Sequence, residues 1–327
     1  MSFSDEQLKQ HCEIILKDRK IFNKVIVLCE GTIPKEQGRR SPQSYQRMEE
    51  VPDANFYRAC TPKNWITNTP VFFVCGNCNN AIDTYITLQK MLKEDKEEMS
   101  SREIKQLNYY HPKQIFVVID LDNQIRKIHN YHLATTQEIF FSLYEKTKIN
   151  LLNTETKHSI IVTGLIHKEA YFLIPELQEE IFDKYKIQSF YKGSKLSLEE
   201  IYLAMSNEID QDKNLVSNLE IIRPRIKNCI DLDFDTVEQF KHNWIKQFQN
   251  ESNNQRKREF ILSLLTVLNV KKNYWEQIMP AQGINPRQHR DQLSLEIARD
   301  FYAKQTDDEA AAKYHIPYFF KMLRKFA

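Results

Sequence analysis

Four largely apolar runs of strand length divide the first half of the chain. They are VIVLC (25–29), VFFVC (71–75), IFVVI (115–119) and SIIVT (159–163). A strand that helices cover on both faces has such a run, because neither face meets water. Segments with helical spacing of apolar residues separate the runs, at 5–20, 53–60 and 80–95. This alternation predicts an α/β fold with a mostly parallel sheet flanked by helices.

Beyond residue 186 the apolar residues recur at the three- and four-residue steps of helices. The clearest helical segments are LSLEEIYLAM (196–205), DTVEQFKHNWIKQFQN (235–250), REFILSLLTVLNV (258–270) and LSLEIARDFYAKQ (293–305). A chain of 327 residues has room for two domains. We therefore expect an α/β domain at residues 1–185 and a mainly helical domain at 186–327, which would supply dimerisation or substrate contacts.

Charge and composition indicate the cellular location and the class of partner more clearly than the activity. The formal net charge is +2, so no global basic field indicates nucleic acid, although a local basic surface is compatible with it. No run approaches the roughly 18 apolar residues of a membrane span, and the first 20 residues lack the apolar stretch of a signal peptide. Several of the six cysteines stand in apolar runs, as reduced core thiols do. We expect a cytoplasmic protein without a membrane partner.

Acidic residues follow two of the predicted strands at the point where each ends. Glu30 comes directly after the first run, and Asp120 after the third, with Asp122 two residues later. Ligands of parallel sheets bind outside the carboxyl ends of the strands, where side chains are held by the sheet and reach solvent. Asp120 and Asp122 can point to the same side if the chain stays extended. We therefore expect the three carboxylates to converge.

Three convergent carboxylates would form a site for a hard cation. Mg²⁺, or Mn²⁺ in its place, takes carboxylate oxygens together with waters and substrate phosphate oxygens. Without a cation the carboxylates would repel one another. Such a metal can polarise a phosphoryl oxygen and activate a water, which is the chemistry of phosphodiester cleavage. Glu30, Asp120 and Asp122 are thus the predicted metal ligands of a metal-dependent phosphodiesterase.

Five short segments carry a resemblance to a known family. In chain order they are VIVLCEG, DANFY, VFFVCGN, IFVVIDLD and KEAYFLIPE, and they span roughly residues 21–180. This series resembles the TOPRIM domains of bacterial anti-phage nucleases. That branch includes the overcoming-lysogenization-defect nucleases and the TOPRIM toxin subunit of the PARIS defence system. Glu30 with Gly31 matches the family's first acidic motif, and Asp120 with Asp122 matches its Asp-x-Asp.

The resemblance implies further roles. It makes Thr32–Pro52 an insertion, Asp53 a carboxylate that supports the metal ligands, and Glu169 a further catalytic carboxylate. It also implies a Mg²⁺-dependent endonuclease that acts as a toxin-like effector of anti-phage defence. The substrate would be DNA or RNA, including transfer RNA. An ATPase regulatory subunit and a second copy of the chain are the partners expected from the resemblance.

Two other functions stay open at this point. One is a TOPRIM-like module that binds nucleic acid or regulates a partner without cleaving. The other is a primase-like nucleotidyl transferase, which is disfavoured because the sequence has no obvious zinc ribbon or helicase-binding appendage. No Walker A or Gly-x-Gly-x-x-Gly motif is present in the sequence, which argues against nucleotide hydrolysis or dinucleotide binding by this chain.

Weaker candidates have simpler explanations. Cys75 and Cys78 lack the second cysteine pair of a structural zinc site. His129 and His132 can be ordinary surface residues, and Asp235 can cap the helix that follows it. Basic residues near the expected site or in the helical half could contact phosphates, but solvated surface charges are the favoured interpretation of each. They are Arg39, Arg40, Lys168, Arg223, Arg225 and Lys227.

Overall fold

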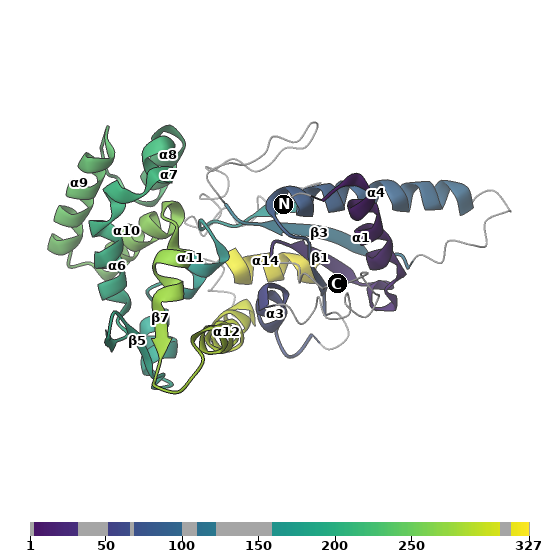
Figure 1. Cartoon of the computed structure of the whole chain (residues 1–327). Helices are drawn as coiled ribbons and strands as arrows, with labels where there is room; N and C mark the ends of the chain where they lie inside the picture. Colours follow the sequence, from purple (N-terminus) through teal and green to yellow (C-terminus); the bar gives the residue numbers. More distant parts are fainter. Residues whose placement is uncertain are drawn as a thin grey trace.

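The computed structural model describes residues 3–31, 52–65, 69–99, 110–121, 159–307 and 315–326. The molecule is elongated, with a sheet lobe at one end and a helical lobe at the other (Figure 1). Short helix α11 (Val270–Asn273) lies between the sheet and the outer helices of the helical lobe.

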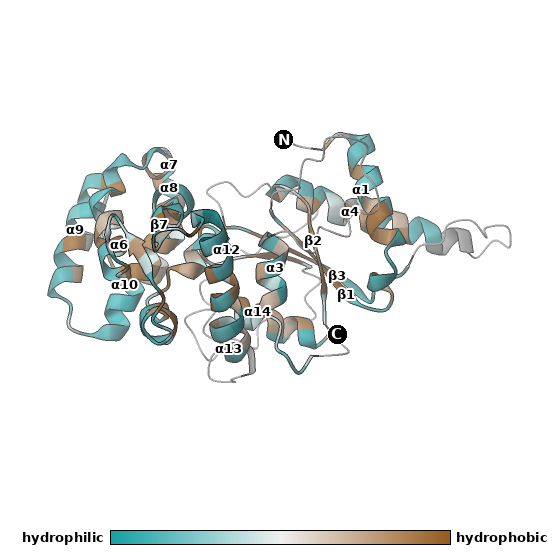
Figure 2. Cartoon of the chain, turned by 60° about the horizontal axis from the view of Figure 1, so that its bottom comes forward, coloured by the Kyte–Doolittle hydropathy of each residue, from teal (hydrophilic) through white to brown (hydrophobic). Residues whose placement is uncertain are grey.

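The sheet lobe contains the predicted parallel sheet. Its strands are β1 (Val25–Cys29), β2 (Val71–Val74), β3 (Gln114–Ile119) and β4 (Ile160–Val162), in the order β2-β1-β3-β4. All three pairings are parallel, and almost every strand residue is buried. Figure 2 shows these strands as a hydrophobic band next to helices with polar outer faces. The predicted α/β fold and its four strands are confirmed.

Helices cover both faces of this sheet. On one face lie α1 (Asp5–Lys17) and α4 (Cys78–Met99), and on the other α3 (Pro52–Ala59) and α14 (His315–Arg324) (Figure 1). Helix α1 begins at Ser4, whose hydroxyl accepts the Gln7 N–H while the Gln7 side chain accepts the Ser4 N–H. A 3₁₀ turn, η1 (Arg19–Ile21), leads from α1 into β1.

The helical lobe follows β4. It consists of η4 (Lys168–Phe172), η5 (Gln178–Asp183), α6 (Leu198–Asn207), η6 (Ile209–Gln211), α7 (Lys213–Ser217), α8 (Leu219–Cys229), α9 (Val237–Asn250), α10 (Asn254–Val267), α11 and η7 (Trp275–Gln277). Trp244 of α9 is fully buried there, stacks on Phe248 and donates its indole N–H to the Phe260 carbonyl. The predicted helical character of this region is confirmed.

A small antiparallel sheet in this lobe was not predicted. Its strands are β5 (Ser189–Tyr191), β6 (Ser194–Lys195) and β7 (Ile278–Pro280), in the order β6-β5-β7. β5 and β7 are each three residues long. The two segments that pair lie about 90 positions apart, so their short apolar stretches carry no local strand signal of their own.

The last helices return to the sheet lobe. They are α12 (Pro286–Ile297), η8 (Ala298–Tyr302), α13 (Ala303–Asp307) and α14. The Tyr302 ring lies 6.1 Å from that of Phe56 in α3, and the Phe320 ring 6.0 Å from that of Phe72 in β2. These helices lie beyond the domain boundary expected near residue 185, yet they complete the core of the sheet lobe. Among the described helices, none combines the length and apolar character needed to span a membrane.

Candidate active site

Glu30 and Asp120 meet at the carboxyl edge of the sheet. β1 and β3 are neighbours in register, with Cys29 opposite Val118, so the residues that follow them lie side by side. The Glu30 Oε1 accepts the backbone N–H of Asp120 at 2.8 Å, across 90 positions of sequence. Both residues are partly exposed. Two of the three predicted metal ligands therefore converge as expected, and Asp122 lies outside the described residues.

Asp53 lies at the same edge although 22 positions separate it from Gly31. Gly31 has a φ of +155°, and a Cβ placed on it would lie 2.4 Å from the Asp53 Oδ2. Its N–H donates to the Gly76 carbonyl at 2.8 Å, which links the ends of β1 and β2. A side chain at position 31 would thus displace Asp53, so glycine is required by both space and backbone conformation. The structure places Asp53 beside the Glu30-Gly31 turn, as the resemblance implied.

Lys168 connects Asp53 to Glu169. The Lys168 ammonium forms an ion pair with the Asp53 Oδ1, and the two side chains are only 12% and 18% exposed. Burial lowers the pKa of Lys168, and the Lys271 charge acts in the same direction, while Glu169 opposes the shift. Lys168 therefore lies in an enclosed place between two carboxylates, and the structure brings this predicted residue into the site.

Glu169 is buried and held by cations. Its Oε1 lies 3.1 Å from the Nζ of Lys271 in α11. Burial acts to raise the pKa of the Glu169 carboxyl, yet the neighbouring Lys168 and Lys271 ammonium groups lower it below its usual range. Glu169 is thus ionised at neutral pH, with the Lys168 and Lys271 ammonium groups balancing its charge.

A hydrogen-bond network fixes the turn that carries Lys168 and Glu169. The Tyr171 hydroxyl accepts the N–H of Gly164 at 2.9 Å and of Leu165 at 3.3 Å, and is 2.8 Å from the His315 Nδ1. The His315 ring lies where a Cβ on Gly164 would be, 1.6 Å from that position. Burial lowers the pKa of His315 well below its ordinary value, so the imidazole is neutral. Because the Tyr171 oxygen already accepts two N–H groups, its O–H donates a hydrogen bond to the His315 Nδ1.

Arg225 of α8 holds the turn after β3. It is 1% exposed, and one guanidinium nitrogen lies 3.5 Å from the Leu121 carbonyl, in the middle of the Asp-x-Asp motif. The Leu121 N–H donates to the Thr163 hydroxyl at the end of β4, at 3.1 Å. Both interpretations of Arg225, a solvated charge and a phosphate contact, are therefore wrong, because the side chain is buried against the motif.

The donor set fits a divalent metal of the predicted kind. Among the described residues, no group of three or more His, Cys, Asp or Glu side chains is arranged to hold a metal ion. Mg²⁺, however, commonly uses one or two carboxylates and completes its shell with water and phosphate oxygens. Glu30 and Asp120 offer two carboxylates on rigid strand ends with partial exposure. Asp53 is engaged by Lys168 and so is not a third ligand in this arrangement.

The other sequence candidates do not assemble into a site. Cys75 is a buried thiol at the end of β2, and burial raises its pKa above the ordinary value. Lys227, a candidate for phosphate contact, forms an ion pair with Asp233 at 3.0 Å. The cap of α9 is Thr236 rather than Asp235, because the Thr236 hydroxyl accepts the Gln239 N–H. Arg39, Arg40, His129 and His132 lie outside the described residues.

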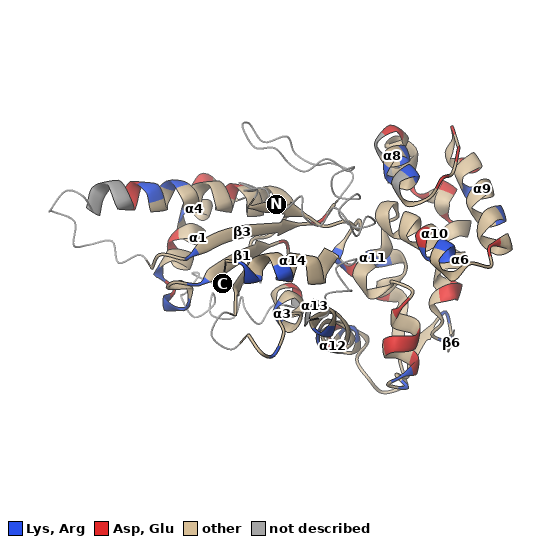
Figure 3. Cartoon of the chain, turned by 180° about the vertical axis from the view of Figure 1, so that it is seen from behind, with Lys and Arg blue, Asp and Glu red and all other residues tan. Residues whose placement is uncertain are grey.

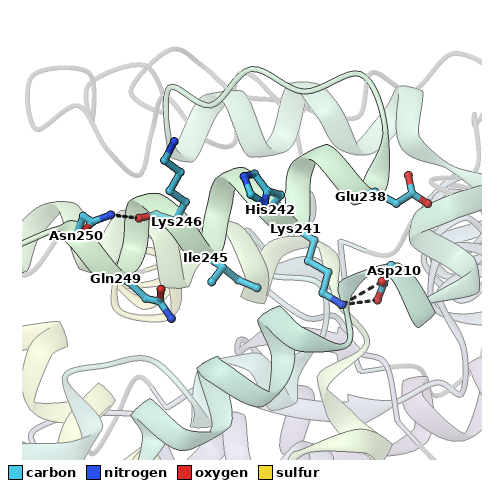
Figure 4. A pocket seen from close by; sticks show the side chains of 8 residues that line it. All are labelled: Asp210, Glu238, Lys241, His242, Ile245, Lys246, Gln249 and Asn250. Carbon is cyan, nitrogen blue, oxygen red and sulfur yellow. Dashed lines mark hydrogen bonds and ion pairs between the residues drawn. The ribbon is translucent and has the colours of Figure 1, made fainter.

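A cleft of about 400 Å³ lies elsewhere, along the outer face of α9. Figure 4 shows its lining, in which Lys241 binds both oxygens of Asp210 at 2.9 and 3.0 Å. None of the predicted site residues lines it. The cleft is therefore separate from the strand-end carboxylates, and its charged residues can serve as control positions for substitutions in the site.

Sequence reasoning missed Tyr171, Lys271 and His315. Tyr171 resembles any aromatic core residue, and Lys271 stands in an ordinary basic pair, so neither has a local signal. His315 lies 144 positions from the tyrosine it contacts. Comparisons of the chain with protein-family models, with curated proteins and with solved structures found no match.

Proposed function

We propose that this chain is a Mg²⁺- or Mn²⁺-dependent endonuclease that cleaves the phosphodiester backbone of DNA or RNA, including transfer RNA. The convergence of Glu30 and Asp120 carries the proposal. They stand at the carboxyl ends of adjacent parallel strands, joined by a 2.8 Å hydrogen bond, with partial access to solvent. Ligands of open parallel sheets bind at this edge.

Glu30, Asp120 and Asp122 would hold the metal, which when bound supplies a Lewis acid for the phosphoryl oxygen and an activated water. The chain's own groups orient these ligands. The Asp120 N–H fixes the Glu30 carboxylate, while Thr163 and Arg225 hold the Leu121 peptide from two sides. Such fixed geometry matters because carboxylates that must rotate into place bind a metal more weakly.

Lys168 would stabilise the negative charge of the substrate phosphate. Its ammonium is mostly enclosed, and an enclosed cation interacts more strongly with a developing charge than an exposed one. Glu169 would keep Lys168 protonated and in place, since its charge opposes the lowering of the Lys168 pKa. Asp53 anchors the ammonium on the other side.

The biological setting follows from the TOPRIM resemblance alone. We propose an effector of anti-phage defence that forms a homodimer and is restrained by an ATPase regulatory subunit. A cytoplasmic location agrees with the cysteines, which are all free thiols, since disulfides are rare in that compartment. Figure 3 shows acidic and basic positions interspersed along the ribbon of both lobes, so nucleic acid would be recognised locally rather than by a global field.

The test is a cleavage assay on a panel of substrates. Purified protein is incubated with single- and double-stranded DNA, structured RNA and transfer RNA, in Mg²⁺, Mn²⁺ or EDTA. We expect metal-dependent cleavage that Glu30→Gln and Asp120→Asn each abolish and that Asp210→Asn leaves unchanged. Folding of each variant is checked by its thermal melt.

Cleavage that survives both neutralising variants would contradict the proposal. Binding without cleavage would favour the non-catalytic module instead. Incorporation of labelled nucleotides on a single-stranded template would favour the nucleotidyl transferase.

A further inference from the structure

Lys271 reaches the sheet edge from the helical lobe. It belongs to the four-residue helix α11, between the sheet and α10, and its Nζ lies 3.1 Å from the Glu169 Oε1. Its side chain is 49% exposed, whereas that of Lys168 is only 12% exposed. Of these two lysines, Lys271 is therefore the more accessible to solvent and to a substrate arriving from solvent.

The charges around Lys271 keep it cationic. Burial acts to lower its pKa, but Glu169, Glu276 and Asp120 raise it above the ordinary value. Glu169 follows Lys168 in the chain, and Lys168 pairs with Asp53 beside Gly31, so the Lys271–Glu169 contact joins Lys271 to the strand-end site. An ammonium has three N–H donors, and Glu169 Oε1 needs only one of them.

The carboxylates of the site make such a cation useful. Glu30, Asp53, Asp120 and Glu169 bring four negative charges, against which Lys168 and Lys271 place two positive ones. A nucleic acid approaching this edge would be repelled by the remaining charge. A divalent metal would offset it at one point only, whereas the backbone carries a charge at every phosphate.

We propose that Lys271 binds a backbone phosphate of the substrate next to the one being cleaved, so that the helical lobe forms part of the nucleic-acid-binding surface. This rests on the proposed function for the identity of the site. The substrate strand would pass from the ends of β1 and β3 over α11, where Lys272 is also exposed. A contact to phosphate positions the strand and does not read its sequence.

The experiment measures binding of a fluorescent single-stranded oligonucleotide, in EDTA, at a series of salt concentrations. For Lys271→Met we expect affinity about five- to tenfold weaker on every sequence. The slope of log K against log salt concentration should fall in magnitude by about 0.7 to 1, the change expected for the loss of one phosphate contact. Lys271→Arg should keep most of the affinity. Lys246→Met, an exposed lysine beside the α9 cleft in Figure 4, is the matched control and should bind as wild type does.

An unchanged salt dependence in Lys271→Met, an equal loss in Lys246→Met, or no binding by wild type would each overturn the proposal. A thermal melt separates these results from unfolding, and Lys271→Gln replaces Lys271→Met if the latter does not fold. The two proposals fail separately. If wild type cleaves but Lys271→Met binds normally, only this inference is wrong. If Lys271→Met loses a contact but no variant or wild type cleaves, only the nuclease activity is wrong.

Discussion

The Lys168–Asp53 ion pair gives a quantitative prediction about the site. Lys168→Met removes the ammonium and leaves Asp53 as a largely enclosed carboxylate beside Gly31. Asp53→Asn removes the opposite charge, and the double variant removes both. The stability of the four proteins, compared as a double-mutant cycle, isolates the free energy with which the two side chains interact.

The exposure of the two side chains determines how strong their interaction is expected to be. Two unit charges about 4 Å apart attract by about 4 kcal/mol in surroundings with an effective dielectric constant of about 20. Exposed pairs retain about 0.2–1 kcal/mol of this, and removal of one partner from a buried pair costs about 3–5 kcal/mol. With side chains 12% and 18% exposed, the pair is nearer the buried case, so we expect a coupling of about 1–3 kcal/mol.

A divalent metal should change the result. Lys168→Met leaves excess negative charge at the edge of the sheet, and a metal bound by Glu30 and Asp120 would offset part of it. The loss of stability in Lys168→Met should therefore be smaller in Mg²⁺ than in EDTA, when both are measured by urea denaturation. Lys241 and Asp210, an ion pair at 2.9 Å with side chains 26% and 35% exposed, provide the control cycle.

The control pair should give a coupling of about 0.2–1 kcal/mol that Mg²⁺ does not alter. Two results would refute the reasoning. One is a Lys168–Asp53 coupling no larger than that of the control pair, and the other is a Lys168→Met deficit that is the same with and without metal.

Two further predictions concern the residues that shape the site. Gly31→Ala should destabilise the fold by about 1–3 kcal/mol and weaken metal binding. The reason is that the alanine Cβ would lie 2.4 Å from the Asp53 Oδ2, at a φ of +155°. A normal thermal melt and normal Mn²⁺ affinity would contradict this. His315 has a lowered pKa in the fold, so below about pH 6.5 the unfolded chain takes up a proton that the folded chain refuses, and stability should fall by up to about 1.4 kcal/mol per pH unit. Urea denaturation between pH 8 and 5 should show a weaker acid dependence in His315→Asn than in wild type, and equal losses would disprove this role of His315.

The sheet and its two strand-end carboxylates were predictable from sequence for a local reason. A strand buried on both faces must be apolar along its whole length, and this run ends abruptly where the chain meets solvent at Glu30 and Asp120. Parallel pairing of β1 with β3 then places both residues at one edge. Glu30 and Asp120 are therefore within hydrogen-bond distance although 90 positions separate them in the sequence.

The rest of the site depends on contacts that no local pattern encodes. Asp53 is an acid in the first turn of a helix, which is a common stabilising position, and only the packing of α3 against Gly31 gives it a place in the site. Arg225 and Lys271 reach the edge from helices whose apolar spacing fixes their buried face but not the strand they meet. The packing of α14 against the sheet could not be predicted from the sequence either. Its apolar face shows that the helix packs on a hydrophobic surface but does not show which one.

The central claim is that Glu30 and Asp120 bind a divalent metal at the ends of β1 and β3, and calorimetric titration with Mn²⁺ tests it most directly. Wild type should bind Mn²⁺, and Glu30→Gln and Asp120→Asn should each weaken binding by about tenfold or more, since loss of one carboxylate from a small set removes a principal ligand. Asp210→Asn, which alters a carboxylate in the separate α9 cleft, should bind as wild type does. Equal Mn²⁺ affinity in wild type, Glu30→Gln and Asp120→Asn would contradict the account.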